Sequence, residues 1–276
     1  MNINIENVTF DQWISIVTQV GAWVTVILIL YTLLEMKTQR KLAQKAELIV
    51  PNVSILGYSR ENGEIFIATY WKNKEAENKD FVVGELPKVT LYNIGAGAAK
   101  GITVRWNFEI EKAVKSIKDY CVQNSLPINI TSDDGYLFVG LKENITGVDI
   151  QADSNFEYPY LLPASVTANG LEVDLPSTIL NVISILSFLT TYQSSPPADR
   201  GPLPSTQIDF ATPYFYLELQ YEDIGRNKYK KRFDVTVSAF SPYFADRQSR
   251  TSYYDPILYG KFEFKERKWF TNKRLF

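Results

Sequence analysis

The pattern of apolar positions divides the chain into one long apolar helix and a remainder of short strands. Residues 12–34 contain no charged side chain and are mostly apolar. At a helical rise of about 1.5 Å per residue this run spans a hydrocarbon core of about 30 Å. Trp13 and Tyr31 stand near its ends, where aromatic anchors meet membrane interfaces. The pattern therefore predicts a transmembrane helix over residues 12–34, with a short extracytoplasmic tail over residues 1–11.

Two other interpretations of this apolar run are a buried soluble helix and a cleaved signal peptide. Buried soluble helices usually interrupt their apolar run within about 14 residues. A signal peptide begins with basic residues, whereas this chain has Glu6 and Asp11 before the run and no lysine or arginine there. No small-residue cleavage site follows. We therefore expect the segment to stay in the mature protein as an anchor.

Basic residues follow the apolar run, whereas only acidic ones precede it. They are Lys37, Arg40, Lys41 and Lys45. The positive-inside rule then places the amino terminus outside and the chain from about Glu35 onward in the cytoplasm, at the inner (cytoplasmic) membrane. Residues 35–50 contain no glycine or proline and predict a basic helical stalk, whose charges are expected to lie against anionic headgroups rather than in a dimer seam.

After Pro51 the pattern changes to short runs that alternate with period two and are separated by turn residues. In residues 102–110, for example, every second side chain is apolar. About seven or eight such runs predict a mainly β domain over residues 51–276, built as an immunoglobulin-like antiparallel β-sandwich rather than a parallel sheet. The last alternating run, residues 261–270, predicts an edge strand protected by lysines.

A second uncharged run, residues 175–198, interrupts the strands. Ser177 or Thr178 can cap a helix there, and we expect an apolar helical insert over about residues 176–192. The apolar side chains of this helix occupy nearly all of its faces, which is typical of a helix that is buried on all sides or lies in a membrane. The favoured interpretation is packing against the sandwich. An interfacial or oligomer-contact helix and a second span are the alternatives.

The composition excludes several kinds of chemistry. The 276 residues include no histidine and one cysteine, Cys121, so the chain has no Ser-His-Asp or Cys-His arrangement, no imidazole zinc ligand and no cysteine cage for a metal. A single cysteine also agrees with a reducing compartment. The net charge of -2 argues against a nucleic-acid partner. We expect no cofactor, no metal and no catalytic site.

Carboxylates are the remaining candidates for chemistry. Asp133 and Asp134 lie in an SDDG sequence that is typical of a turn. Asp153, Asn155 and Glu157 alternate as calcium ligands do, but they lack the loop glycine and the twelve-residue frame of a calcium loop. A carboxylate-dependent hydrolase would have to use Asp133, Asp134, Asp153 and Glu157.

A glycine cluster, NIGAGAAKGI at residues 93–102, is the one candidate for a phosphate loop. Its spacing matches neither the dinucleotide fingerprint nor a Walker loop, and a β-branched run follows where both motifs need a helix. We expect a structural turn joining two strands. Asn93, Gly95 and Gly97 are expected to take positive φ angles, and Ala98 and Ala99 to pack where larger side chains would clash.

These residues also carry a resemblance. The N-x-G-x-G-x-A motif of Asn93, Gly95, Gly97 and Ala99 follows a single span, a basic helix and Pro51, and precedes YLLPAS at 160–165 and LELQYEDIGRNKYKKRFDVTV at 217–237. In this it resembles a broad group of uncharacterised bacterial single-pass membrane-anchored proteins with an immunoglobulin-like β-sandwich. The chain departs from them in the spacing of YEDIGRNKY and in a long insert at about 172–210. The resemblance covers about half the chain and implies a fold and a topology, but no reaction.

The end of the chain combines basic and aromatic residues that suit an anionic membrane or a protein partner. They are Lys265, Arg267, Lys268, Trp269, Phe270, Lys273 and Arg274. The function that we expect is that of a membrane-anchored, non-enzymatic binding or scaffold protein, whose partners are the lipid bilayer and either another protein or a second copy of itself. The alternatives are a membrane-perturbing effector of a bacterial stress or phage-defence system and a ligand-sensing membrane protein.

Overall fold

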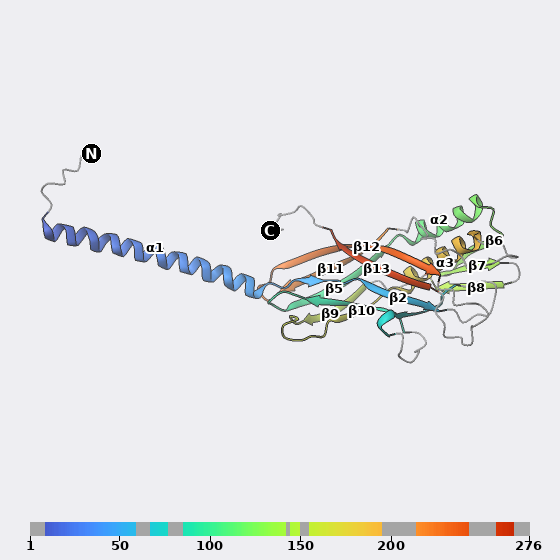
Figure 1. The fold of residues 1–276 in the computed structure, drawn as a ribbon, viewed down its shortest axis with the longest axis horizontal. Helices are drawn as coiled ribbons and strands as arrows, with labels where there is room; N and C mark the ends of the chain where they lie inside the picture. Colours follow the sequence, from blue (N-terminus) through green and yellow to red (C-terminus); the bar gives the residue numbers. More distant parts are fainter. Residues whose placement is uncertain are drawn as a thin grey trace.

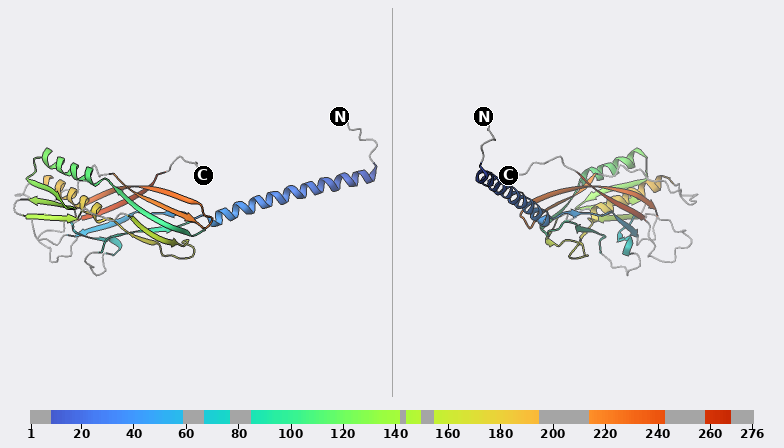
Figure 2. Two further views of the ribbon diagram at one scale, coloured as in Figure 1. Left: turned by 180° about the vertical axis from the view of Figure 1, so that it is seen from behind. Right: turned by 60° about the vertical axis from the view of Figure 1, so that its left-hand side comes forward.

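A computed structural model describes residues 9–58, 67–76, 85–141, 144–149, 155–194, 214–242 and 258–267. Helix α1 (Phe10–Gln44) projects from one end of an elongated β-rich body, as both further views also show (Figures 1 and 2). None of its residues is buried, and it is long and apolar enough to cross a membrane. The predicted long apolar helix is thus confirmed.

The helix continues beyond the apolar run but ends before the predicted stalk does. Its last residue is Gln44, and Leu48–Ile49 already form strand β1. The prediction of helix to residue 50 is therefore wrong for residues 45–50. Leu48 is fully buried, so burial of this short segment in the β body outweighs its helix propensity.

The main element of the body is an antiparallel sheet of seven strands that curls into a half-barrel (Figure 1). The strand order is β3-β2-β13-β12-β11-β5-β9. The strands are β2 (Val53–Tyr58), β3 (Tyr70–Asn73), β5 (Ala99–Phe108), β9 (Asn155–Leu161), β11 (Phe215–Asp223), β12 (Lys228–Pro242) and β13 (Leu258–Glu266), and a short 3-10 helix η2 (Lys74–Ala76) follows β3. Strand β13 lies between β12 and β2, so the prediction of an edge strand is wrong.

A second antiparallel sheet shares its core with the half-barrel. It has the order β1-β4-β10, with β4 (Lys88–Asn93) between β1 and β10 (Leu171–Asp174). Leu48, Leu91 and Val173 of this sheet join Ile102, Leu217 and Phe262 of the half-barrel in one buried cluster. The mainly β, antiparallel architecture is confirmed. The immunoglobulin-like sandwich is not, because seven strands form one curled sheet rather than two facing sheets.

A smaller unit lies at the end of the body away from α1 (Figure 1). It comprises helix α2 (Ile110–Gln123) and a sheet of β6 (Ile128–Asp133), β7 (Tyr136–Leu141) and β8 (Asn144–Asp149). The sequence analysis missed α2. Its buried residues, Ala113, Ile117 and Cys121, recur at the four-residue spacing of one helix face.

Helix α3 (Ser177–Ser194) is the predicted apolar insert, and it is enclosed between the two cores. Leu180 and Ile183 belong to the core of the half-barrel, and Ile185 and Phe188 to that of the smaller unit. The insert therefore packs inside the domain, as the favoured interpretation held.

Candidate functional site

The end of helix α1 is held by loops from three separate parts of the chain. We call this arrangement the helix socket. It consists of Gln44, Lys45, Ala46 and Glu47 together with Asn93, Gly95, Gly97, Ala164 and Gly225. The connection between α1 and β1 is only residues 45–47, and Ala46 in its middle is buried. The junction is thus a packed element of the fold.

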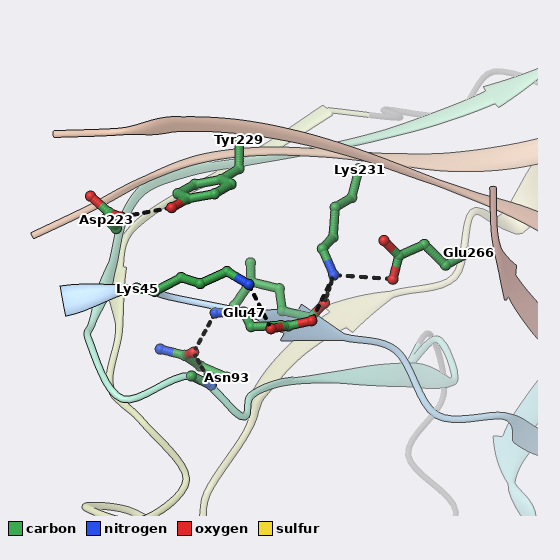
Figure 3. Close-up of polar contacts among 9 residues, drawn as sticks. Lys45, Glu47, Asn93, Asp223, Tyr229, Lys231 and Glu266 are labelled. Carbon is green, nitrogen blue, oxygen red and sulfur yellow. Dashed lines mark hydrogen bonds and ion pairs between the residues drawn. The ribbon is translucent and has the colours of Figure 1, made fainter. Parts of the chain in front are cut away.

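Asn93, the last residue of β4, is the centre of the socket (Figure 3). Its side chain is buried, and its Oδ1 accepts hydrogen bonds from the backbone N–H groups of Glu47 and Gly95, both at 3.0 Å. Its Nδ2 donates to the carbonyl oxygens of Gly97 at 2.8 Å and Leu161 at 3.2 Å. One amide thus joins the helix exit, the glycine turn and strand β9. An aspartate here would have no donor for the last two bonds.

Backbone bonds complete the grip on residues 45–47. The N–H of Ile94 donates to the carbonyl of Glu47 at 2.8 Å, and that of Gly97 donates to the carbonyl of Lys45 at 3.0 Å. The N–H of Ala164, in the loop after β9, donates to the carbonyl of Asn93 at 2.7 Å. The chain that leaves α1 is therefore bonded to the β domain at both of its charged residues.

Gly95 and Gly97 serve close approach rather than backbone conformation, whereas Gly101 of the same cluster has a positive φ angle of 53°. A Cβ at Gly97 would lie 2.1 Å from the carbonyl oxygen of Gln44, and one at Gly95 would lie 2.4 Å from that of Lys45. Neither glycine nor Asn93 has a positive φ angle, so that part of the prediction is wrong. The reason is that the turn links strands of two different sheets, and its tightness comes from the helix end packed against it. Ala98 and Ala99 are buried, as predicted.

The turn between β11 and β12 forms another side of the socket. Gly225 lies beside Gln44, since a Cβ there would be 3.2 Å from Oε1 of that glutamine. Asp223 holds the turn together: its carboxylate accepts hydrogen bonds from the backbone and side chain of Asn227 and, at 2.8 Å, from the hydroxyl of Tyr229. Arg226 takes a left-handed conformation with φ of 62°. Hydrogen bonds within the turn therefore fix its conformation where it meets the helix.

The environment of this turn shifts three pKa values. Burial alone would raise the pKa of Asp223, but the hydrogen bonds from Asn227 and Tyr229 lower it below its ordinary value. Burial raises the pKa of Tyr221 to about 12. Burial, together with the hydrogen bond to Asp223, also raises the pKa of Tyr229. At neutral pH the turn thus holds a carboxylate and two neutral phenols, and the two phenol rings stack with centroids 5.1 Å apart.

A row of alternating charges connects the helix exit to the last described strand (Figure 3). The ammonium of Lys45 lies 3.2 Å from the carboxylate of Glu47, and that of Lys231 lies 3.9 Å from the other oxygen of the same group. Lys231 also bonds the carbonyl of Leu48 and the carboxylate of Glu266, both at 3.0 Å. The side chain of Lys231 is largely buried, so its ion pair with Glu266 is less screened by salt than a fully exposed pair. The row links α1, β1, β12 and β13.

Three of the stretches that carried the resemblance meet in this socket. They are the N-x-G-x-G-x-A turn, the YLLPAS loop and the YEDIGRNKY turn, which supply Asn93, Ala164 and Gly225. Among the predicted membrane-proximal basic residues, Lys45 lies in the socket, whereas Lys37, Arg40 and Lys41 are exposed on α1. The sequence analysis missed Glu47, Lys231 and Glu266. No local spacing signals their contact, because they lie on strands brought together only by the fold.

The predicted surface at the end of the chain lies mostly outside the described residues. Lys268, Trp269, Phe270, Lys273 and Arg274 are not described. Lys265 is exposed near the end of β13, and Arg267 follows that strand, where its N–H donates to the carbonyl of Arg232 at 2.8 Å and its guanidinium lies 3.6 Å from Asp234. These two residues are thus on the outer surface of the half-barrel.

The structure places the candidate carboxylates on different sheets. Asp133 ends β6 and Asp134 lies in the turn to β7, with a positive φ angle of 43°. Glu157 lies on β9 of the seven-stranded sheet, and Asp153 lies outside the described residues. Within the described part of the chain, no group of three acidic or cysteine side chains is arranged to hold a metal ion. The arrangement with the most developed geometry is therefore the socket, which can transmit position and orientation between α1 and the β domain.

Comparison with known proteins adds no relative to this description. The chain matches no family model, no curated protein and no solved structure.

Proposed function

We propose that this is a membrane-anchored, non-enzymatic scaffold or binding protein whose β domain engages a protein partner or a second copy of itself. In this proposal α1 crosses the inner membrane once, with the amino terminus outside and the β domain in the cytoplasm. The basic residues after the apolar run support that orientation. The resemblance to bacterial single-pass proteins with an immunoglobulin-like domain is consistent with this topology, and we retain it as a hypothesis.

The observation that carries the proposal is the connection of three residues held by the socket. A protein that needs only attachment to a membrane can use a flexible linker, which leaves the domain free to rotate. Here the backbone of Lys45 and Glu47 is bonded to the β domain and Ala46 is buried. Such a junction fixes the direction in which the domain faces relative to the bilayer. A fixed direction matters when a partner, or a second anchored copy, must be met in one geometry.

The orientation is tested by cysteine accessibility in intact cells. Single cysteines replace Asn4 or Ser195 in a background where Cys121 is replaced by serine. We expect a membrane-impermeant thiol reagent to label only position 4. Labelling at position 195 would place the domain outside the cell and overturn the cytoplasmic part of the proposal.

The scaffold role is tested by cross-linking the full chain in its membrane. Three forms are compared: the natural chain, a chain with a short Gly-Ser insertion between Gln44 and Lys45, and a chain with the same insertion in the exposed turn between Asp134 and Gly135. We expect the natural chain to give a cross-linked species of defined composition, either two copies or one copy with one other protein. The insertion at the socket should abolish it, and the control insertion should leave it unchanged.

Two results would contradict the proposal. The first is a natural chain that gives no such species. The second is equal cross-linking in both insertion variants, which would show that a fixed direction has no role. A membrane-perturbing effector would instead release dye from vesicles in a manner that depends on residues 176–192. That function would require α3 to leave the two cores that enclose it.

A further inference from the structure

Exposed apolar side chains gather at the end of the β domain that receives α1. Ile94, Leu162, Val166 and Ile224 are 57%, 38%, 68% and 47% exposed. All four lie in loops that form or adjoin the socket: Ile94 follows Asn93, Leu162 and Val166 flank Ala164, and Ile224 precedes Gly225. They therefore lie on the loops next to the base of the helix. Single exposed apolar residues are ordinary, but a group of four on the loops nearest a transmembrane span indicates contact with an apolar or interfacial environment.

Basic side chains accompany these apolar residues. Lys100 is the second residue of β5, beside the glycine turn, Arg226 lies in the β11–β12 turn, and Lys228 begins β12. All three are exposed. The last turns of α1 add exposed basic residues at Lys37, Arg40 and Lys41. The combination of basic and apolar residues on one surface is typical of proteins that bind the interface of an anionic membrane.

Two acidic residues of the same end, Asp223 and Glu47, are engaged within the protein. Asp223 is buried, and its carboxylate accepts hydrogen bonds from Asn227 and Tyr229. Glu47 is paired with Lys45. Glu222 lies directly across the sheet from Lys100 on one side and Lys228 on the other. Lys100, Arg226 and Lys228 thus outnumber Glu222, so the net charge on the outer surface of this end is positive.

The length of α1 places this end near the bilayer surface. Nine residues, 35–43, separate the apolar run from the socket, which at about 1.5 Å per residue is roughly 14 Å. The headgroup layer fills about 5–7 Å of that distance. A typical helix tilt of about 20° lowers one side of the domain toward the headgroups. Long basic side chains then span much of the remaining distance between the domain and the lipid phosphates.

We propose that a collar formed by Ile94, Lys100, Leu162, Val166, Ile224, Arg226 and Lys228 docks on the anionic phospholipid headgroups of the membrane that α1 crosses. The basic residues bind lipid phosphates, and the apolar tips enter the interface on the side toward which the helix tilts. Because the socket fixes α1 to the domain, this contact also sets the tilt of the whole protein. The inference rests on the transmembrane placement of α1 in the proposed function, but not on what the β domain binds.

The test uses full-length protein reconstituted at about one copy per vesicle. Cysteines replacing Val166 or Ile224, in a chain whose Cys121 is replaced by alanine, carry an environment-sensitive fluorophore. A third label at Val122, exposed at the end of α2, serves as the control position. The vesicles are phosphatidylcholine alone or phosphatidylcholine mixed with phosphatidylglycerol, each containing a headgroup-labelled quenching lipid. We expect phosphatidylglycerol to increase quenching at position 166, position 224 or both, and added salt to reverse it, with position 122 unaffected.

A charge variant tests the collar itself. Replacing Arg226 and Lys228 with glutamine should lower the ratio of docked to undocked protein by roughly fivefold per lost charge. Replacing Lys112 and Lys118 of α2 with glutamine removes the same charge elsewhere and should leave the ratio unchanged. Circular dichroism and flotation with the vesicles show that each variant is folded and inserted, so a failure of α1 to insert is distinguished from a failure to dock.

Three results would overturn the inference. Quenching that is independent of phosphatidylglycerol at both collar positions would exclude anionic headgroups as the ligand. Quenching that appears only when each vesicle holds several copies would show that the collar contacts a second copy of the protein. Equal effects of the two charge variants would show that only net charge matters.

Discussion

Helices α1 and α3 are both built on uncharged apolar runs, yet their surroundings are opposite. Every residue of α1 lies outside the core, whereas α3 is enclosed between two cores. The difference lies in how their polar groups are satisfied. The hydroxyls of Thr18, Thr25 and Thr32 each donate to the carbonyl four residues earlier in α1, so these three hydroxyls need no outside partner. In α3 the hydroxyl of Ser184 instead accepts the N–H of Ala68, which lies outside the helix.

The comparison indicates what makes a helix suitable for lipid or for a protein core. A membrane offers no hydrogen-bond partners, so a helix whose polar side chains are satisfied internally tolerates it. Polar residues of α3 recur at every third position, at Thr178, Asn181, Ser184 and Ser187, and all four are buried. At 100° per residue these four positions turn through half the helix circumference, so the domain encloses polar side chains of α3 on more than one side.

The largest expected effect comes from placing a charge in each helix. Leu180→Asp should prevent the β domain from folding, because an unpaired buried carboxylate costs more than about 4 kcal/mol of a total stability of about 5–15 kcal/mol. Ile27→Asp in α1 should weaken membrane insertion by about 3 kcal/mol and leave the domain folded. Circular dichroism and limited proteolysis of the full chain in detergent measure folding, and flotation with vesicles measures insertion. If Leu180→Asp folded normally, α3 would not be the core helix described above.

A smaller effect is expected where the two regions join. Gly97→Val places a side chain against the carbonyl of Gln44 and should cost about 1–3 kcal/mol, the usual range for overpacking. Chemical denaturation followed by tryptophan fluorescence measures the stability. A spin-label distance between α1 and the domain should broaden, because the socket opens. Gly140→Ala, whose Cβ would meet its nearest neighbours at 3.7 Å, is the control. Equal losses in both variants would show that the socket has no special tightness.

The next effect separates the two kinds of hydroxyl. Ser184→Ala removes the acceptor of the Ala68 N–H and should lower the free energy of unfolding by about 1 kcal/mol, the net contribution of a typical hydrogen bond. Thr25→Ala removes a hydroxyl that is satisfied within α1, and the stability of the β domain should not change. Denaturant midpoints of the two variants test the difference. A loss for Thr25→Ala as large as that for Ser184→Ala would contradict this account of the two helices.

Most features that depend on local sequence were predictable, with helix α2 as the exception, and those that depend on distant contacts were not. The uncharged run at 12–34 predicted the long apolar helix α1. Apolar residues on nearly all sides of the helix predicted at 176–192 made packing against the domain the favoured interpretation, ahead of an interfacial helix and a second span. Strand β13 was predicted at an edge because its alternating lysines suggested one, but its pairing with β2 joins residues about two hundred positions apart in the chain. Nothing in a local pattern reports such a pairing.

The candidate site shows the same division. The glycine cluster was recognised as a structural turn, and the chemistry of phosphate binding was set aside for a sound reason, the missing helix. Its positive φ angles were expected because glycine is most often needed for conformation. At Gly95 and Gly97 the need is instead space for the backbone of Gln44 and Lys45, which come about fifty residues earlier in the chain. A partner of that kind becomes visible only in the folded structure.

The last expected effect, which is absent at neutral pH, concerns Tyr221 of β11, close to the turn that contacts the helix end. Burial raises the pKa of Tyr221 to about 12, so the folded state keeps this phenol neutral. In the unfolded chain a tyrosine ionises near pH 10. The contribution of Tyr221 to stability is therefore complete below about pH 10 and is lost as the pH rises toward 12. In Tyr221→Phe the group that titrates is gone, so the stability of the variant should fall less between these two pH values than that of the natural chain. Denaturation series across this range measure the two slopes, and parallel slopes would show that Tyr221 ionises as freely in the folded domain as in the unfolded chain.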